Sequence, residues 1–210
     1  MLYHKIQTVF HRDPATKYRT LIDGVFSLPE FEALQDDQWE GTEKIDGTNI
    51  RIEWDGKNLN FGGRTHKTEC PPHVNKALSD MCNRMEYRAT FGADNVTLFG
   101  EAYGGKVQRQ KGGLTYSPVT KFILFDIFIE GDGWVDRGMV ENMARAMGAD
   151  CVPIVFKGTL REAIDFVKSA PDSTIGTVKM EGLVLRPAVE QTAANGDRVI
   201  TKIKVNDFRL

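Results

Sequence analysis

The stretch of sequence that decides the fold is Glu43-Lys44-Ile45-Asp46-Gly47-Thr48-Asn49. Apolar and polar residues alternate after it, on both sides of Asp55-Gly56, and this pattern predicts a hairpin over residues 48–61. Gly47 permits a turn directly before the hairpin, and Lys44 precedes that turn. The four letters K-x-D-G alone fit a solvated lysine beside a turn as well as they fit a functional one.

The functional interpretation of Lys44 is a nucleophile that attacks phosphorus. An amine attacks only when it is neutral, and about one free lysine in a thousand is neutral at pH 7. A nucleophilic lysine therefore needs a site with little water or with other cations close by. If Lys44 reacts, further charged residues should accompany it.

The rest of the chain predicts an α+β fold with largely antiparallel sheets, because strands outnumber helices and several are joined by hairpins. One helical segment is expected to open at Pro71-Pro72 and to close at Gly92. A second helix is expected at about 137–147 and a third after a Thr159–Glu162 capping box. Further strands are expected at 96–101, 121–130, 182–186 and 198–205.

Composition excludes several classes of protein. The chain has 210 residues, 41% hydrophobic and 27% charged, which is ordinary for a globular protein. It contains no apolar run long enough to cross a bilayer and no signal peptide at its start, so no membrane partner is expected. The net charge of −2 argues against tight, non-specific binding of nucleic acid. Three widely spaced cysteines indicate reduced thiols and a cytoplasmic location.

Four later segments carry charged or aromatic residues at strand positions. They are Leu98-Phe99-Gly100-Glu101, the run from Phe122 to Phe128 around Asp126, Met180-Glu181-Gly182-Leu183-Val184, and Thr201-Lys202-Ile203-Lys204. The last segment alternates two lysines onto one face of a strand. Taken singly, each segment fits an ordinary strand edge or core strand.

Taken together and in this order, these segments resemble the motifs of the covalent nucleotidyltransferase superfamily, which contains ATP-dependent ligases and mRNA capping enzymes. The resemblance implies the nucleotidyltransferase (adenylation) fold and a covalent lysyl-AMP on Lys44. It implies that Glu101 binds the nucleotide ribose and that Phe125, next to Asp126, stacks on the base. It also implies ATP and Mg²⁺ or Mn²⁺ as cofactors.

The resemblance further implies a set of residues for each role. The implied catalytic residues are Lys44, Asp46, Lys202 and Lys204. The implied nucleotide-binding residues are Glu43, Lys44, Ile45, Arg64, Glu101, Phe125, Glu181, Lys202 and Lys204. Glu181, Glu101 and Asp46 would hold the metal through water. The residue types suit the chemistry, because in-line attack on the α-phosphorus develops negative charge that fixed cations stabilise.

Within the superfamily, the chain looks most like the nick-sealing RNA ligases of phages and the RNA-editing ligases. Asn49 decides this, because DNA ligases and capping guanylyltransferases usually have arginine at that place. Asp46 is a departure, since many of these RNA ligases have histidine there. The resemblance predicts a single domain over residues 1–210, without an appended C-terminal domain, that joins RNA 5′-phosphate and 3′-OH ends, nicked or paired. The resemblance includes phage enzymes, so a phage origin with action in the host's cytoplasm fits the sequence, and any accessory protein is left open.

Three alternatives stay open: a DNA ligase, a capping guanylyltransferase, and a nucleotide-binding module without catalysis. Two other clusters are candidate sites. His66, Cys70 and His73 are three potential zinc ligands but lack a complete zinc signature. The glycine-rich loop at 103–113 carries Lys106, Arg109 and Lys111, and is either solvated chain or a clamp on the RNA backbone. Asn49 is expected to act with it on RNA ends.

Overall fold

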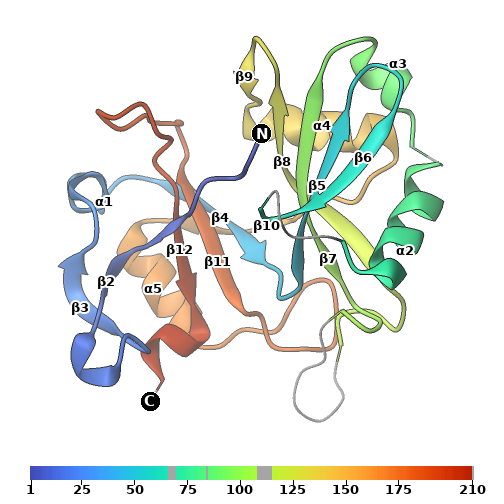
Figure 1. Cartoon of the computed structure of the whole chain (residues 1–210). Helices are drawn as coiled ribbons and strands as arrows, with labels where there is room; N and C mark the ends of the chain where they lie inside the picture. Colours follow the sequence, from blue (N-terminus) through green and yellow to red (C-terminus); the bar gives the residue numbers. More distant parts are fainter. Residues whose placement is uncertain (66–69, 84, 108–114, 210) are drawn as a thin grey trace. The chain divides into compact units, whose positions relative to one another are not determined.

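Figure 1 shows the computed structural model of the chain, which describes residues 1–65, 70–83, 85–107 and 115–209. The chain forms two compact units, and each consists of two separate stretches of sequence. The first unit comprises Met1–His4 and Asp46–Val152, and the second comprises Lys5–Ile45 and Pro153–Leu210. The boundary after Ile45 falls inside the stretch that contains the predicted nucleophile.

The second unit is built on a five-stranded sheet. In spatial order its strands are β1 (Gln7–Thr8), β12 (Thr201–Lys204), β11 (Gly182–Pro187), β4 (Trp39–Lys44) and β10 (Ile154–Gly158). β1 runs parallel to β12, and the other neighbouring pairs are antiparallel. A two-stranded ribbon and short helical segments complete the unit: β2 (Phe10–Arg12), β3 (Leu21–Phe26), η1 (Pro14–Thr16), α1 (Pro29–Ala33) and η2 (Val205–Phe208).

One face of this sheet is covered by helix α5 (Leu160–Lys168). The helix buries Leu160, Ala163, Ile164 and Val167, which recur at helical spacing. Its start is fixed by the predicted capping box, in which the backbone N–H of Thr159 donates to the carboxylate of Glu162 at 2.7 Å. Since alternate strand residues pack against α5, the residues between them lie on the opposite face of the sheet.

The first unit contains a second five-stranded sheet, antiparallel throughout the described strands. In spatial order its strands are β6 (Leu59–Gly63), β5 (Thr48–Trp54), β7 (Val96–Tyr103), β8 (Lys121–Ile129) and β9 (Gly133–Trp134). Its helices are α2 (Pro72–Cys82), α3 (Tyr87–Phe91) and α4 (Arg137–Met147).

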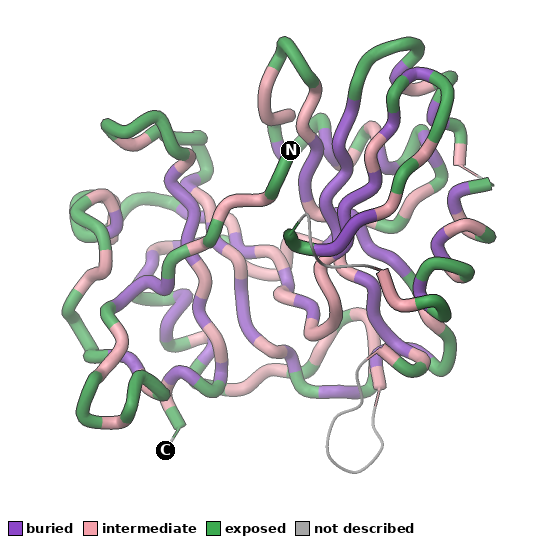
Figure 2. The backbone as a smooth tube through the Cα atoms, viewed as in Figure 1, coloured by how far each residue is buried: buried purple, intermediate pink, exposed green. Residues whose placement is uncertain are grey.

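Helices α2 and α4 contact strand β8, and α3 contacts α4. Between sheet and helices lies a hydrophobic core that includes Ile50, Ile52, Leu98, Leu124 and Ile127. Figure 2 shows the buried residues running along the central strands of each unit. The opposite face of the first unit's sheet carries polar residues such as Arg51 and Glu101, together with buried aromatic residues such as Phe99.

Most of the predicted elements are confirmed, including the α+β class, the hairpin at 48–61 and the helix at 137–147. The prediction of one helical segment from Pro71 to Gly92 is wrong in detail, because the structure has two helices there, α2 and α3. Met85 misled the pattern: it lies outside both helices yet still packs against the same core. Hydrophobic spacing reports which side chains face the core, not whether the backbone between them is helical.

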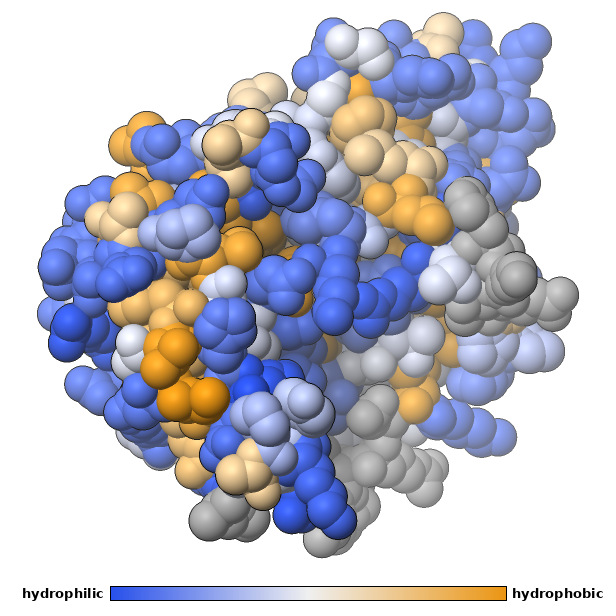
Figure 3. Space-filling view, turned by 60° about the vertical axis from the view of Figure 1, so that its left-hand side comes forward, coloured by the Kyte–Doolittle hydropathy of each residue, from blue (hydrophilic) through white to orange (hydrophobic). Residues whose placement is uncertain are grey.

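The surface in Figure 3 is largely hydrophilic, with hydrophobic residues in patches. Among the described residues, no helix has both the length and the apolar character needed to cross a membrane. Cys70, Cys82 and Cys151 are free thiols, as expected. Burial raises the pKa of the Cys82 and Cys151 thiols, which makes both poor nucleophiles at neutral pH.

Candidate active site

The predicted nucleophile is the last residue of β4, and the register of the second unit's sheet sets its neighbours. Lys44 stands opposite Gly182 in β11, and Gly182 stands opposite Lys204 in β12. Residues opposite one another point to the same face of a sheet, so two lysines share a face with only a glycine between them. Lys202 is two residues before Lys204 and points to that face as well. The prediction that β12 displays both lysines on one face is confirmed.

Glu181 joins the two lysines. Its Oε2 lies 2.5 Å from Nζ of Lys44, and its Oε1 lies 2.8 Å from Nζ of Lys204. The three side chains are partly buried, with exposed fractions of 23%, 14% and 33% for Lys44, Glu181 and Lys204. Two ammonium groups therefore share one carboxylate, which leaves net positive charge on this face. Such a face favours the approach of an anion such as a phosphate.

Gly182 makes this close arrangement possible. A Cβ atom at this position would lie 2.0 Å from the backbone oxygen of Ile203 and 2.8 Å from Cα of Lys204. No side chain fits there without moving β11 away from β12. The glycine thus lets the two strands come close enough for the preceding residue, Glu181, to reach Lys204.

Glu43 points to the other face of β4 and is 1% exposed. Its Oε2 accepts hydrogen bonds from the backbone N–H and the hydroxyl of Thr174, at 2.9 and 2.6 Å. Its Oε1 is buried and has no hydrogen-bond partner among the described residues. A buried acceptor without a partner is costly, so Oε1 is available to a donor from a ligand.

The first unit carries the residues that follow the nucleophile. Asn49 in β5 stands opposite Glu101 in β7, so these two predicted site residues share the sheet face that is turned away from the helices. Gly47 is needed for close approach: a Cβ there would lie 2.2 Å from the backbone oxygen of Ala102. The backbone N–H of Asp46 donates to the hydroxyl of Tyr116 at 3.4 Å. The loop therefore packs tightly along the end of β7.

The sequence predicted one arginine near this hairpin, and the structure adds another. Arg64 directly follows β6 and is exposed. Arg51, which was not predicted, is 6% exposed, and its guanidinium donates to Glu53 at 2.8 Å and to the backbone oxygen of Gly63 at 3.1 Å. Arg51 lies two residues after Asn49 in β5 and therefore on the same face of the sheet. The alternating pattern of this strand predicted a solvent-exposed position for Arg51, not a buried one.

The predicted base-stacking residue lies at an irregularity of β8. Phe99 pairs with Asp126 and Gly100 pairs with Leu124, so Phe125 is an extra residue at a bulge. Tyr3 packs its ring edge-on against Phe125, with 5.1 Å between centroids, and its hydroxyl donates to Asp126 at 2.8 Å. Tyr3 was not predicted, because nothing in the sequence near position 3 points to a partner 123 residues away.

Lys106 is exposed and follows Gly104 and Gly105, both with positive φ. Arg109 and Lys111, the other predicted cations of this loop, lie outside the described residues. His66, one of the three potential zinc ligands, also lies outside the described residues. Within the described part of the chain, no three His, Cys, Asp or Glu side chains are grouped to hold a metal ion.

Comparisons with known proteins identify the family of the chain and similar solved structures. A model of the RNA ligase family matches residues 37–204. A search of curated protein sequences gave no significant match. Solved structures of Naegleria gruberi RNA ligase variants are similar: one with AMP and Mn is 16% identical with a TM-score of 0.66, over 98% of this chain and 56% of that chain. Another, with ATP and Mn, is 19% identical with a TM-score of 0.65, and the match covers 95% of this chain and 59% of that chain.

An archaeal ATP-dependent RNA ligase is also similar, with 15% identity and a TM-score of 0.59 over 97% of this chain and 47% of that one. The chain thus spans about half the length of the ligases it matches. These structures confirm the predicted nucleotidyltransferase fold. Since the family model covers all of the sequence from before β4 to the end of β12, the chain belongs to the RNA ligase family.

Proposed function

We propose that this chain is an ATP-dependent RNA ligase that joins 5′-phosphate and 3′-OH ends through AMP bound covalently to Lys44. One observation carries the proposal: Lys44 ends β4 on a face where Glu181 links it to Lys204. Membership of the RNA ligase family supports it independently.

The contacts of Lys44 suggest how the nucleophile is controlled. Nζ of Lys44 donates a hydrogen bond to Glu181, so the carboxylate orients the amine. Attack on the α-phosphorus requires the neutral amine, which forms a P–N bond while pyrophosphate leaves. Lys202 and Lys204 lie on the same face and supply positive charge for the phosphate oxygens. The AMP then passes to an RNA 5′-phosphate, and a 3′-OH displaces it.

One carboxylate oxygen of Glu43 favours ATP over GTP as the nucleotide that the site binds. Its buried Oε1 lacks a hydrogen-bond donor among the described residues, and the exocyclic amino group of adenine is a donor. Guanine presents a carbonyl oxygen at the corresponding ring position, which a carboxylate repels. A capping guanylyltransferase is therefore disfavoured, and Glu43→Gln should weaken the preference for ATP.

Glu181 would hold a divalent cation through water, because both of its oxygens already contact lysines. Mg²⁺ is commonly held through one or two carboxylates together with substrate phosphates, so the lack of a larger acidic group among the described residues is compatible with it. Glu101 and Asp46, in the first unit, are the other candidates. Bound Mg²⁺ or Mn²⁺ would neutralise charge on the phosphates, and the Naegleria gruberi ligase structures with Mn support this choice.

RNA with 5′-phosphate and 3′-OH ends, nicked or paired, is the proposed substrate, and the cytoplasm the proposed location. Asn49 shares a sheet face with Glu101, which supports a role at the RNA ends after adenylation. Lys106 is exposed, as a contact with the RNA backbone would require. We propose that it forms a clamp with Arg109 and Lys111, which lie outside the described residues.

The test is incubation with ATP labelled in the α-phosphate and a divalent metal, followed by a denaturing gel. The parent should form an acid-labile adenylate, and Lys44→Ala should form none. Lys179→Ala is the matched control, because Lys179 is an exposed lysine paired with Asp172 outside the site. A labelled band of normal intensity in Lys44→Ala would refute the assignment. Sealing of matched RNA and DNA nicks then distinguishes an RNA ligase from a DNA ligase.

A further inference from the structure

Asp207 is a buried carboxylate just past the predicted phosphate-binding lysines. It lies in η2, which directly follows β12, and is 3% exposed. A buried carboxylate is unfavourable unless it is paired and hydrogen-bonded. The sequence resemblance assigns it no role, so its partners in the structure are informative.

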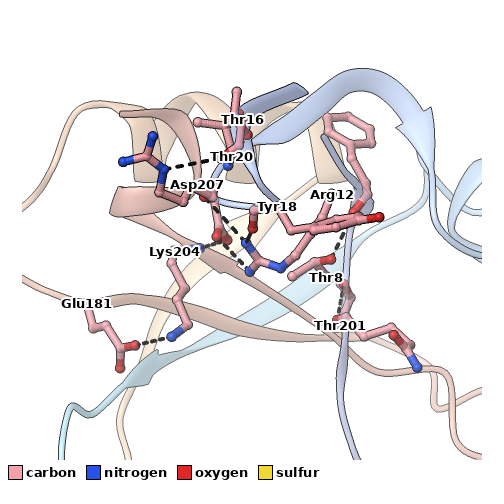
Figure 4. A network of polar contacts seen from close by, with 12 residues as sticks. Thr8, Arg12, Thr16, Tyr18, Thr20, Glu181, Thr201, Lys204 and Asp207 are labelled. Carbon is pink, nitrogen blue, oxygen red and sulfur yellow. Dashed lines mark hydrogen bonds and ion pairs between the residues drawn. The ribbon is translucent and has the colours of Figure 1, made fainter. Parts of the chain in front are cut away.

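Both oxygens of Asp207 are used, and one of them holds Lys204. Its Oδ2 accepts a hydrogen bond from the backbone N–H of Lys204 at 2.9 Å. Its Oδ1 lies 2.9 Å from Nη2 of Arg12. Figure 4 shows these contacts in one network that continues from Lys204 to Glu181. Asp207 therefore fixes the backbone of Lys204, while the side chain of that lysine reaches the active site.

Arg12 makes a second contact besides the one with Asp207. It ends β2, and its Nη1 donates to the backbone oxygen of Tyr18 at 3.1 Å. Arg12 thus connects the loop after β2 to Asp207, which is 195 residues away in the sequence. The side chain of Arg12 is 34% exposed and that of Asp207 is 3% exposed, so solvent screens this pair only in part.

The network reaches the nucleophile in two further contacts. Nζ of Lys204 lies 2.8 Å from Glu181, and Glu181 in turn contacts Lys44. A shift of the Lys204 backbone would therefore move its ammonium group and release the carboxylate that orients Lys44. We propose that Asp207 and Arg12 are positioning residues that hold Lys204 for formation of the lysyl-adenylate. This rests on the proposed function, and neither residue is expected to touch ATP or RNA.

The alternative is that Arg12 and Asp207 merely stabilise the fold. The two roles differ in kinetics, which can be measured in the full chain well below the melting temperature of each variant. Misplacing a catalytic group by about 1 Å costs on the order of 100-fold in rate. We therefore expect Asp207→Asn and Arg12→Gln each to lower the maximal single-turnover rate of adenylation by at least about tenfold. The ATP concentration for half-maximal rate should change little.

Two comparisons make the test specific. Asp172→Asn removes an exposed carboxylate from a pair with Lys179 and should change neither parameter. In a Lys204→Ala background, Asp207→Asn should have no further effect, because its partner in positioning is already gone. Arg12→Lys keeps the charge and serves if Arg12→Gln does not fold; it should lose less activity than Arg12→Gln.

Each result has a defined meaning. A folded Asp207→Asn with a lower melting temperature but the parent's maximal rate would overturn the positioning role. So would an equally large loss from Asp207→Asn with and without Lys204. A parent that forms no adenylate would instead refute the proposed function, and the positioning role with it.

Discussion

Replacing Gly182 by alanine is the sharpest test of how the active-site sheet is built. The added Cβ would lie 2.0 Å from the backbone oxygen of Ile203, whereas real Cβ contacts essentially never fall below 3.0 Å. Strand β11 must therefore move from β12 by about 1 Å, because the three nearest atoms, O and C of Ile203 and Cα of Lys204, all belong to the backbone of β12 and cannot rotate away. The shift falls between Lys44 and Lys204.

Two magnitudes follow from that displacement. A misplacement of about 1 Å costs on the order of 100-fold in the rate of lysyl-adenylate formation. Overpacking of this kind costs about 1–3 kcal/mol of stability. For a chain of this size, that loss lowers the melting temperature by roughly 2–12 °C. We expect the rate to suffer more than the stability, because the strain is local while the catalytic contacts span all three strands.

The assay is single-turnover adenylation with labelled ATP, combined with thermal melting. Gly138→Ala is the control: this glycine lies in α4, where a Cβ would meet only the side-chain oxygen of Asp136, at 3.2 Å. Alanine favours a helix over glycine by about 1 kcal/mol, so this variant should be as stable as the parent or more so. A Gly182→Ala protein with the parent's rate and melting temperature would show that the spacing of β11 and β12 is unimportant.

Three further outcomes are expected. Phe125→Ala should raise the half-saturating ATP concentration several-fold with a smaller effect on the maximal rate, because stacking on the base is lost; a lowered maximal rate at unchanged half-saturation would contradict this. Asn49→Ala should slow sealing of a pre-adenylated RNA nick while sparing self-adenylation, and equal sealing by parent and variant would remove Asn49 from the RNA end. Hydrogen bonds from Thr159 lower the pKa of Glu162, so Glu162 stabilises the fold above its ordinary pKa and this contribution is lost as pH falls through the lowered value. The difference in melting temperature between the parent and Glu162→Gln should therefore shrink from about pH 6 to about pH 3, and a constant difference would show that the carboxylate's charge is irrelevant.

Local signals account for the elements that the sequence predicted. The helix at 137–147 has a clear apolar stripe and ends at Gly148 in a left-handed conformation, and the hairpin at 48–61 has strict alternation. β4 and β10 were missed for physical reasons. In β4 the buried positions are Trp39, Gly41 and Glu43. Only one of these residues has a large apolar side chain, so the sequence shows no alternating hydrophobic pattern there. β10 is largely half-buried and has only weak alternation.

The residues of the candidate site also differ in whether the sequence could predict them. Lys44, Glu181 and Lys204 could be predicted because they stand in short segments whose order is distinctive, and the structure brings these three together. Asp207 and Tyr3 could not, since their roles depend on partners more than a hundred residues away. No pattern of neighbours in the sequence encodes such a contact.

The interleaving of the two units has a consequence for how the chain acquires its structure during synthesis. The sheet of the first unit needs only residues from Thr48 to Trp134, so it can form as soon as that stretch has left the ribosome. The sheet of the second unit must wait for β12, whose Thr201 pairs with Gln7 across 194 residues. At about 5–20 residues per second, the roughly 50 residues after Val152 take several seconds to appear. For most of that interval β4, which ends in the reactive lysine, lacks its neighbour β11, so the nascent chain is exposed to aggregation at that edge, and adenylation should begin only once β12 has been made.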